Sequence, residues 1–264
     1  MLWYLANKPK CSYVVLTKTL ARRVGRTGKG CVMAHGVIHR ALDGYRFQIS
    51  GDLDLTLPFT SVTRYAVDGR IYELTSGDHQ AASAWAEDLG IRHFDDEFSV
   101  QGGTLRTTRV THYDQRVGLE DHLLAVMWQG RNYSLFVPMY SAKAADAVRL
   151  FQLLRVTEHQ DGITAASRNP KRAGIAEPAD VAKEIPGIGL LEITALTKTT
   201  ARRLPAWSGA QVHSGELFRD TLDDDTTYFL LATSSAMVTV LPHESRQAAA
   251  VANRIGGLRV ETVA

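Results

Sequence analysis

The sequence has too few cysteines for a disulfide scaffold. Only Cys11 and Cys31 occur among 264 residues, and neither has the spaced partners that a zinc site requires. Apolar runs long enough to cross a membrane are absent, and the opening "MLWYLANKPK" lacks the charged region, apolar core and cleavage site of a secretion signal. We therefore expect a cytoplasmic protein without a transmembrane segment.

Acidic residues are missing from the start of the chain. The first 42 residues contain no Asp or Glu but many lysines and arginines, although the net charge of the whole chain is only +2. Acidic clusters follow in "EDLGIRHFDDE" (87–97) and "ELFRDTLDDD" (216–225). This polarity favours self-association or an anionic ligand on one face.

Catalytic and cofactor motifs are also lacking. "GRTGKG" (25–30) does not have the glycine spacing of a phosphate-binding P-loop, and no serine or cysteine lies in a G-x-S-x-G context. His35 and His39 have the spacing of residues on one strand face, but two ligands do not make a metal site. We therefore expect a non-catalytic protein without cofactor or metal, in which "GRTGKG" forms a hairpin loop or binds an anionic headgroup or phosphate.

One phrase occurs twice: "LTKTLARR" at 16–23 and "LTKTTARR" at 196–203, differing only at Leu20 and Thr200. Such a phrase is typical of a strand followed by a bend, with the two arginines exposed to solvent. Alternatively, the paired arginines bind phosphate or carboxylate with bidentate geometry. Together with the neighbouring loop, the first copy gives the candidate anion- or partner-binding residues, which are Lys18, Arg22, Arg23, Arg26 and Lys29.

Three stretches share one local plan of strand, tight turn, strand and Ala-rich helix: 62–90, 123–154 and 228–257. Asp68-Gly69 is a strong signal for a two-residue hairpin turn. Each helical part repeats apolar residues at i, i+3, i+4 and i+7, which predicts an amphipathic helix with Trp85 and Phe151 in the core. The candidate N-caps of these helices are Asp78, Ser141 and Ser245, and a short strand is expected after each helix.

The segment between the second and third stretches has no helical or strand periodicity. It is dense in Gly, Pro, Ala and charge, which is typical of a linker or long exposed loop. The expected organisation is therefore a first repeat unit at 1–96, a short second unit at 97–160, a linker or loop at 161–188 and a third unit at 189–264.

The first stretch, "LTLPFTSVTRYAVDGRIYELTSGDHQAASAWAEDL" (55–89), resembles the bacterial pleckstrin-homology-like (PH-like) domains, where an amphipathic helix follows the last hairpin. The resemblance implies an α+β, predominantly β fold of three tandem PH-like units. Each unit would be a curved antiparallel sheet closed by a C-terminal amphipathic helix. An α+β unit of the sliding-clamp or ferredoxin-like sort is the alternative.

Such tandem units would act as a binding or assembly module that recognises a protein partner, a second copy of itself or an anionic ligand. The repeated sheets would supply surfaces and edges to which a partner adds. The alternative function is a nucleic-acid-associated protein that contacts phosphates through its basic N-terminal block.

Overall fold

The computed structural model describes residues 36–114, 119–243 and 248–263. The chain divides into two compact units. The C-terminal unit contains Tyr45–Phe59 and Asp180–Ala264, with the described residues up to His39, whereas the middle unit contains Arg40–Gly44 and Thr60–Ala179. Among the helices of the described residues, none has the length and apolar character that a membrane span needs.

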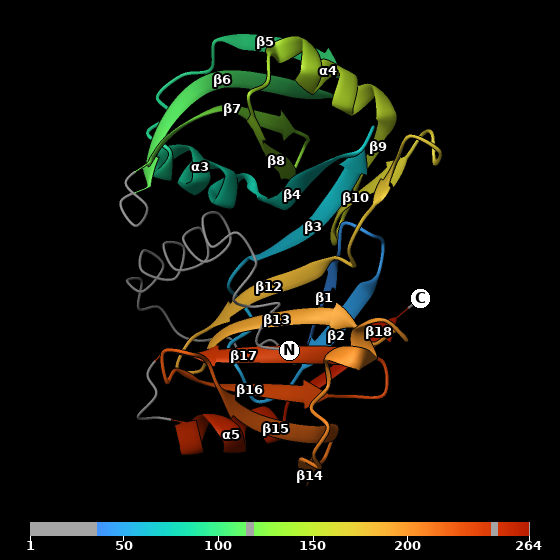
Figure 1. Cartoon of the computed structure of the whole chain (residues 1–264). Coiled ribbons are helices and arrows are strands. Elements are labelled where there is room, and N and C mark those ends of the chain that lie inside the picture. Colours follow the sequence, from blue (N-terminus) through green and yellow to red (C-terminus); the bar gives the residue numbers. More distant parts are fainter. Residues whose placement is uncertain (1–35, 115–118, 244–247, 264) are drawn as a thin grey trace. The chain divides into compact units, whose positions relative to one another are not determined.

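The middle unit is built on an antiparallel sheet with the strand order β3-β4-β8-β7-β6-β5, and β11 pairs with β3 (Figure 1). A separate antiparallel pair joins β9 to β10. The strands are β3 (Phe59–Val67), β4 (Arg70–Asp78), β5 (Asp96–Val100), β6 (Gly103–Asp114), β7 (Leu119–Gln129), β8 (Tyr133–Tyr140), β9 (Leu154–His159), β10 (Gly162–Ser167) and β11 (Ala173–Ile175).

Two helices, α3 (His79–Asp88) and α4 (Ala144–Leu153), cover opposite faces of this sheet (Figure 1). Trp85 of α3 packs against Phe136 of β8 with ring centroids 5.8 Å apart. Residues opposite each other in neighbouring strands share a face, so the register Phe98↔Leu105↔Trp128 places these three side chains on the α4 face. Both faces of β7 and β8 are therefore buried.

Local chemistry explains where α3 begins. The Asp78 carboxylate accepts a hydrogen bond from the Ala81 N–H at 2.8 Å, which confirms the predicted N-cap. Gly77 precedes it because a Cβ at that position would lie 2.8 Å from the Ala81 Cβ. In α4 the predicted cap, Ser141, is wrong: the N-cap residue is Lys143.

The C-terminal unit has an antiparallel sheet in the order β14-β15-β16-β17-β13-β12. A second pair joins β18 to β2. The elements are β1 (Val37–Arg40), which ends at the boundary of the unit, β2 (Arg46–Ser50), β12 (Asp180–Ile185), β13 (Gly189–Ala195), the 3-10 helix η1 (Thr200–Arg203), β14 (Ala210–Val212), β15 (Gly215–Thr221), β16 (Thr227–Ala232), β17 (Ala236–Pro242), α5 (Ala248–Gly256) and β18 (Arg259–Val263).

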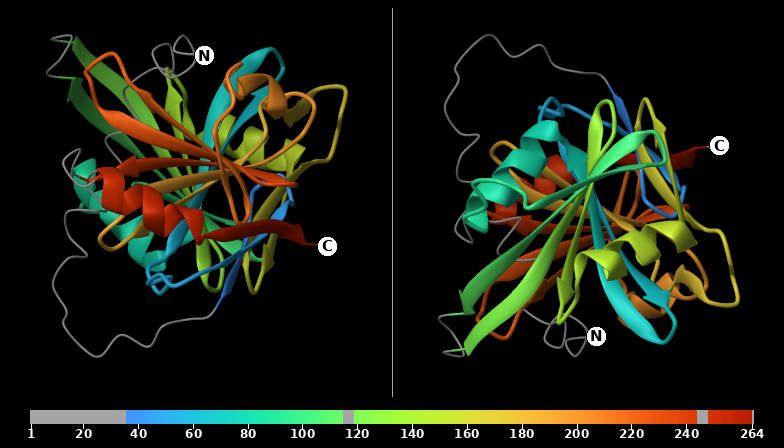
Figure 2. Two further views of the ribbon diagram at one scale, coloured as in Figure 1. Left: turned by 90° about the horizontal axis from the view of Figure 1, so that it is seen from below. Right: turned by 90° about the horizontal axis from the view of Figure 1, so that it is seen from above.

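One face of this sheet carries the core of the C-terminal unit. The register Leu191↔Val240↔Phe229 aligns three side chains that are at most 2% exposed. The helix α5 packs against β16 and buries Val251 and Ile255, and Figure 2 shows it lying along the strands. The burial of these apolar side chains is the main source of stability for the unit.

The expected architecture of three tandem PH-like units, each closed by its own helix, is wrong, although strands do predominate. The first two hairpin-helix stretches share one sheet, because β4 pairs with β8 at Thr75↔Phe136 and the neighbouring positions. They also share a core, since the helix of the first stretch packs on a strand of the second. The repeated pattern encodes a local hairpin and helix, whereas the pairing of strand edges decides which hairpins form one sheet.

The local plan itself is confirmed at all three places, as β3-β4-α3, β7-β8-α4 and β16-β17-α5. Asp68 and Gly69 form the first turn with φ values of 47° and 81°, as the type I′ geometry requires. A strand follows α4 and α5 but not α3, so the strand expected at Ile91 is wrong. The stretch 161–188, expected to be a linker or loop, contains β10, β11 and β12, whose backbone groups pair with other strands.

Candidate groove beside the edge strand β5

The predicted anion-binding residues lie outside the described part of the chain. Lys18, Arg22, Arg23, Arg26 and Lys29 all precede residue 36, as do the "GRTGKG" loop and His35. Their role stays a prediction. His39 is described, and it is a buried residue whose ring stacks on Phe59 with centroids 4.0 Å apart.

The second copy of the repeated phrase is described, and it forms the turn that follows β13 and the 3-10 helix η1. Leu196 packs against a core cluster of Phe218, Leu230 and Met237. Thr200 is fully buried; its hydroxyl donates to the Ala195 carbonyl at 2.6 Å and accepts from the Thr197 N–H at 2.7 Å. In this copy the phrase therefore builds a hydrogen-bonded turn. The first copy has Leu20 in the place of Thr200 and lacks that hydroxyl.

The ionisable side chains of the described residues do not gather into a metal site. Within residues 36–114, 119–243 and 248–263, no group of three or more His, Cys, Asp or Glu side chains has an arrangement suited to a metal ion. Lys183 on β12 is the most unusual ionisable side chain, because burial lowers its pKa to about 8 against the opposing effect of Asp54. It is only 1% exposed and donates to the Leu57 carbonyl, so a substrate has no access to its amine.

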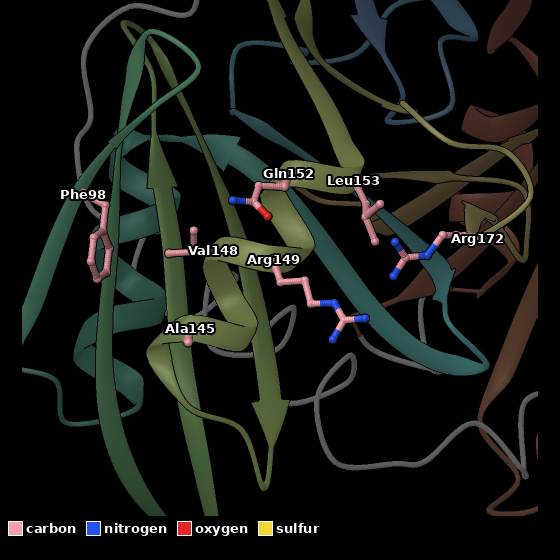
Figure 3. Close-up of a pocket in the computed structure, with 7 residues that line it drawn as sticks. All are labelled: Phe98, Ala145, Val148, Arg149, Gln152, Leu153 and Arg172. Carbon is pink, nitrogen blue, oxygen red and sulfur yellow. The ribbon is translucent and has the colours of Figure 1, made fainter.

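A groove of 540 Å³ runs along the outer side of α4 in the middle unit. Ala145, Val148, Arg149 and Gln152 line it from the helix, at the i, i+3, i+4 and i+7 positions of one stripe. Figure 3 shows the Val148 side chain pointing toward the ring of Phe98, which comes from β5. The remaining lining residues are Leu153 and Arg172.

The strand β5 is an edge strand, since it ends the sheet order in the described part of the middle unit. The turn that follows has two residues, Gln101 and Gly102, with φ values of 53° and 76°. A two-residue turn makes Val100↔Gly103 the closing hydrogen-bonded pair, and bonded and non-bonded positions alternate from there. The backbone N–H and C=O groups of Glu97 and Ser99 therefore point away from β6, toward the open edge.

The edge hairpin is tied to the end of α4 by Gln101. Its side-chain amide donates to the Phe151 carbonyl at 2.7 Å and to the Leu154 carbonyl at 2.9 Å. Its side-chain oxygen accepts from the Val156 N–H at 3.0 Å. One of these bonds ends on α4 and two end on β9, so together they fix the turn after β5 against the C-terminal end of α4.

The charged end of the groove is organised around Asp68 in the β3-β4 turn. The Arg172 guanidinium donates to both oxygens of Asp68, at 2.9 and 2.6 Å, and Arg149 donates to Asp68 Oδ2 at 3.2 Å. These arginines, the hydrogen bond from Arg172 foremost, lower the pKa of Asp68, which is therefore ionised at neutral pH. The three groups together carry a net charge of +1.

Comparison with protein-family models, with curated proteins and with solved structures finds no match for the chain. An exposed sheet edge can accept a strand through main-chain hydrogen bonds, and an adjoining apolar groove can accept the side chains of that strand. The helix, the edge strand and the charged cluster together form an arrangement suited to an extended peptide.

Proposed function

We propose that the protein is a non-catalytic binding module that recognises an extended segment of a protein partner along β5, beside α4. The observation that carries the proposal is the combination of an open edge strand with an apolar groove on the same side. The main-chain groups of Glu97 and Ser99 would bond to the partner strand, while a partner side chain would contact Phe98 and Val148. Main-chain bonds supply affinity in such recognition, and the side-chain groove supplies specificity.

Binding along β5 is tested with peptides selected from a displayed library of random octapeptides on the full-length protein. A selected peptide should slow amide hydrogen exchange at Glu97 and Ser99, because strand addition gives these N–H groups new acceptors. Replacing Phe98 by Ser should weaken peptide binding at least tenfold, since burying an aromatic side chain in a groove contributes about 1.5–3 kcal/mol.

A proline at the open edge separates strand addition from side-chain contact. Ser99→Pro removes an outward N–H but leaves the hydrogen bonds to β6 intact, so peptide binding should be lost while the fold is retained. Gln211→Pro is the matched control: β14 is also a terminal strand, and the two-residue turn after Val212 places Gln211 at the equivalent outward position. The proposal is wrong if both variants bind the selected peptide equally well.

A further inference from the structure

Arg172 and Asp68 form a bidentate ion pair. The guanidinium contacts both carboxylate oxygens, and the Asp68 N–H donates to the Arg172 carbonyl at 2.8 Å. Bidentate geometry of this kind fixes both side chains. The guanidinium of Arg172 is therefore held in place by Asp68.

Arg149 is held much less firmly. Its one hydrogen bond to Asp68, at 3.2 Å, goes to the oxygen that already accepts the 2.6 Å bond from Arg172. The Arg149 side chain is 62% exposed, and the described residues provide it with no second partner. A guanidinium has five N–H donors, so most of those of Arg149 remain available to a ligand in the groove.

The charges around the groove favour an anionic partner. Among the residues that the structure describes, its lining contains two arginines and no Asp or Glu. Three acidic residues on the neighbouring elements have other hydrogen-bond partners: Asp146 accepts from the Lys143 N–H, Glu97 pairs with Arg106, and Asp96 accepts from Thr107. At the Arg149 end, two guanidinium groups share the single carboxylate of Asp68, so this cluster carries a net charge of +1.

We infer that the extended segment bound along β5 presents an Asp or Glu carboxylate to Arg149, next to an apolar side chain held between Phe98 and Val148. This rests on the proposed function and names the chemistry of the partner. A carboxylate carries one negative charge, which matches the net charge of +1 of Arg149, Arg172 and Asp68. A phosphate group carries about −1.5 to −2 at neutral pH, which this cluster does not balance. On binding, Arg149 turns to the partner carboxylate while Arg172 keeps Asp68.

A double-mutant cycle tests this pairing. The selected peptide and its twin with the acidic residue changed to Gln or Asn are titrated against the wild-type protein and Arg149→Gln. The acidic residue should contribute about two- to fivefold to wild-type affinity and nothing to affinity for Arg149→Gln, as expected for an ion pair at an exposed site. Arg92→Gln, at an exposed arginine outside the groove, is the matched control and should preserve the full contribution.

A second test selects octapeptides on Arg149→Glu, a variant in which the charge of this groove residue is reversed. Octapeptides selected on Arg149→Glu should carry Lys or Arg where those selected on the wild type carry Asp or Glu. Peptides that need Phe98 and Ser99 but show no acidic preference would overturn the inference while preserving the proposed function. Loss of peptide selection altogether would overturn both, and so would binding of duplex DNA, instead of peptide, that depends on Arg149.

Discussion

Gln101 and Phe151 are joined across 50 residues of sequence by a 2.7 Å hydrogen bond from the glutamine amide to the phenylalanine carbonyl. Gln101 lies in the turn after β5, and Phe151 lies in the last turn of α4. The carbonyls at a helix end have no partner within the helix, so a side chain from another element satisfies them here. The position of β5 beside α4 depends on this contact.

Shortening Gln101 should therefore loosen the groove. Asparagine tolerates the positive φ of 53° at this position, so Gln101→Asn should not strain the backbone. Its shorter side chain, however, cannot reach all three hydrogen-bond partners of Gln101. Leaving buried polar groups without partners costs about 1–3 kcal/mol, and the free energy of unfolding should fall by that amount in urea titration. Unchanged stability would show that water replaces the glutamine at no cost.

A second prediction concerns the repeated phrase. Thr200→Leu copies the residue of the first phrase into the second and removes a fully buried hydroxyl that bonds to Ala195 and Thr197. It should lower the free energy of unfolding by about 1–3 kcal/mol. Thr199→Leu, at the neighbouring exposed position, is the control and should change stability by less than about 0.5 kcal/mol. Equal effects would mean that the hydroxyl network is dispensable.

Sequence patterns predicted the local elements because their signals lie within a few residues. The Asp68-Gly69 turn, the Asp78 cap and the burial of Trp85 and Phe151 all follow from turn chemistry, capping and helical periodicity. The strands β10, β11 and β12 were missed because their short sequences lack alternation, and pairing with other strands stabilises them.

Sheet composition and the groove depend on contacts between distant residues, which no local pattern reports. Thr75 pairs with Phe136 across two hairpins, and this pairing merges stretches that looked like separate units. Helical periodicity does not reveal the groove, in which Val148 is only partly buried and lies near Phe98. An edge strand is recognised only when the order of the sheet is known.

A third prediction tests the core that the first two stretches share. Trp85 is 1% exposed and packs on Phe136, so Trp85→Ala should cost about 3–5 kcal/mol of unfolding free energy. In a double-mutant cycle with Phe136→Leu, the two losses should not add, because each removes the same contact. Additive losses would show that the two rings do not stabilise each other.

The last prediction concerns Lys183, whose pKa is lowered by burial to about 8 from its ordinary value of 10.5. Between these two pH values the unfolded chain holds a proton that the folded chain has released, so the stability of the fold rises with pH across this window. Below pH 8 the cost of burying the charged amine is constant. The shift corresponds to roughly 3 kcal/mol, at 1.36 kcal/mol for each pH unit.

Lys183→Met has a similar volume and no titratable group. The difference in unfolding free energy between the wild type and this variant should therefore grow in favour of the wild type from pH 8 to pH 10.5, and taking the difference cancels the titration of all other groups. Lys171→Met, at an exposed lysine, should give a flat difference over the same range. Chemical denaturation at several pH values supplies the measurement. A flat difference for Lys183→Met would mean that the amine stays charged in the core, with the Leu57 carbonyl and Asp54 compensating for its burial.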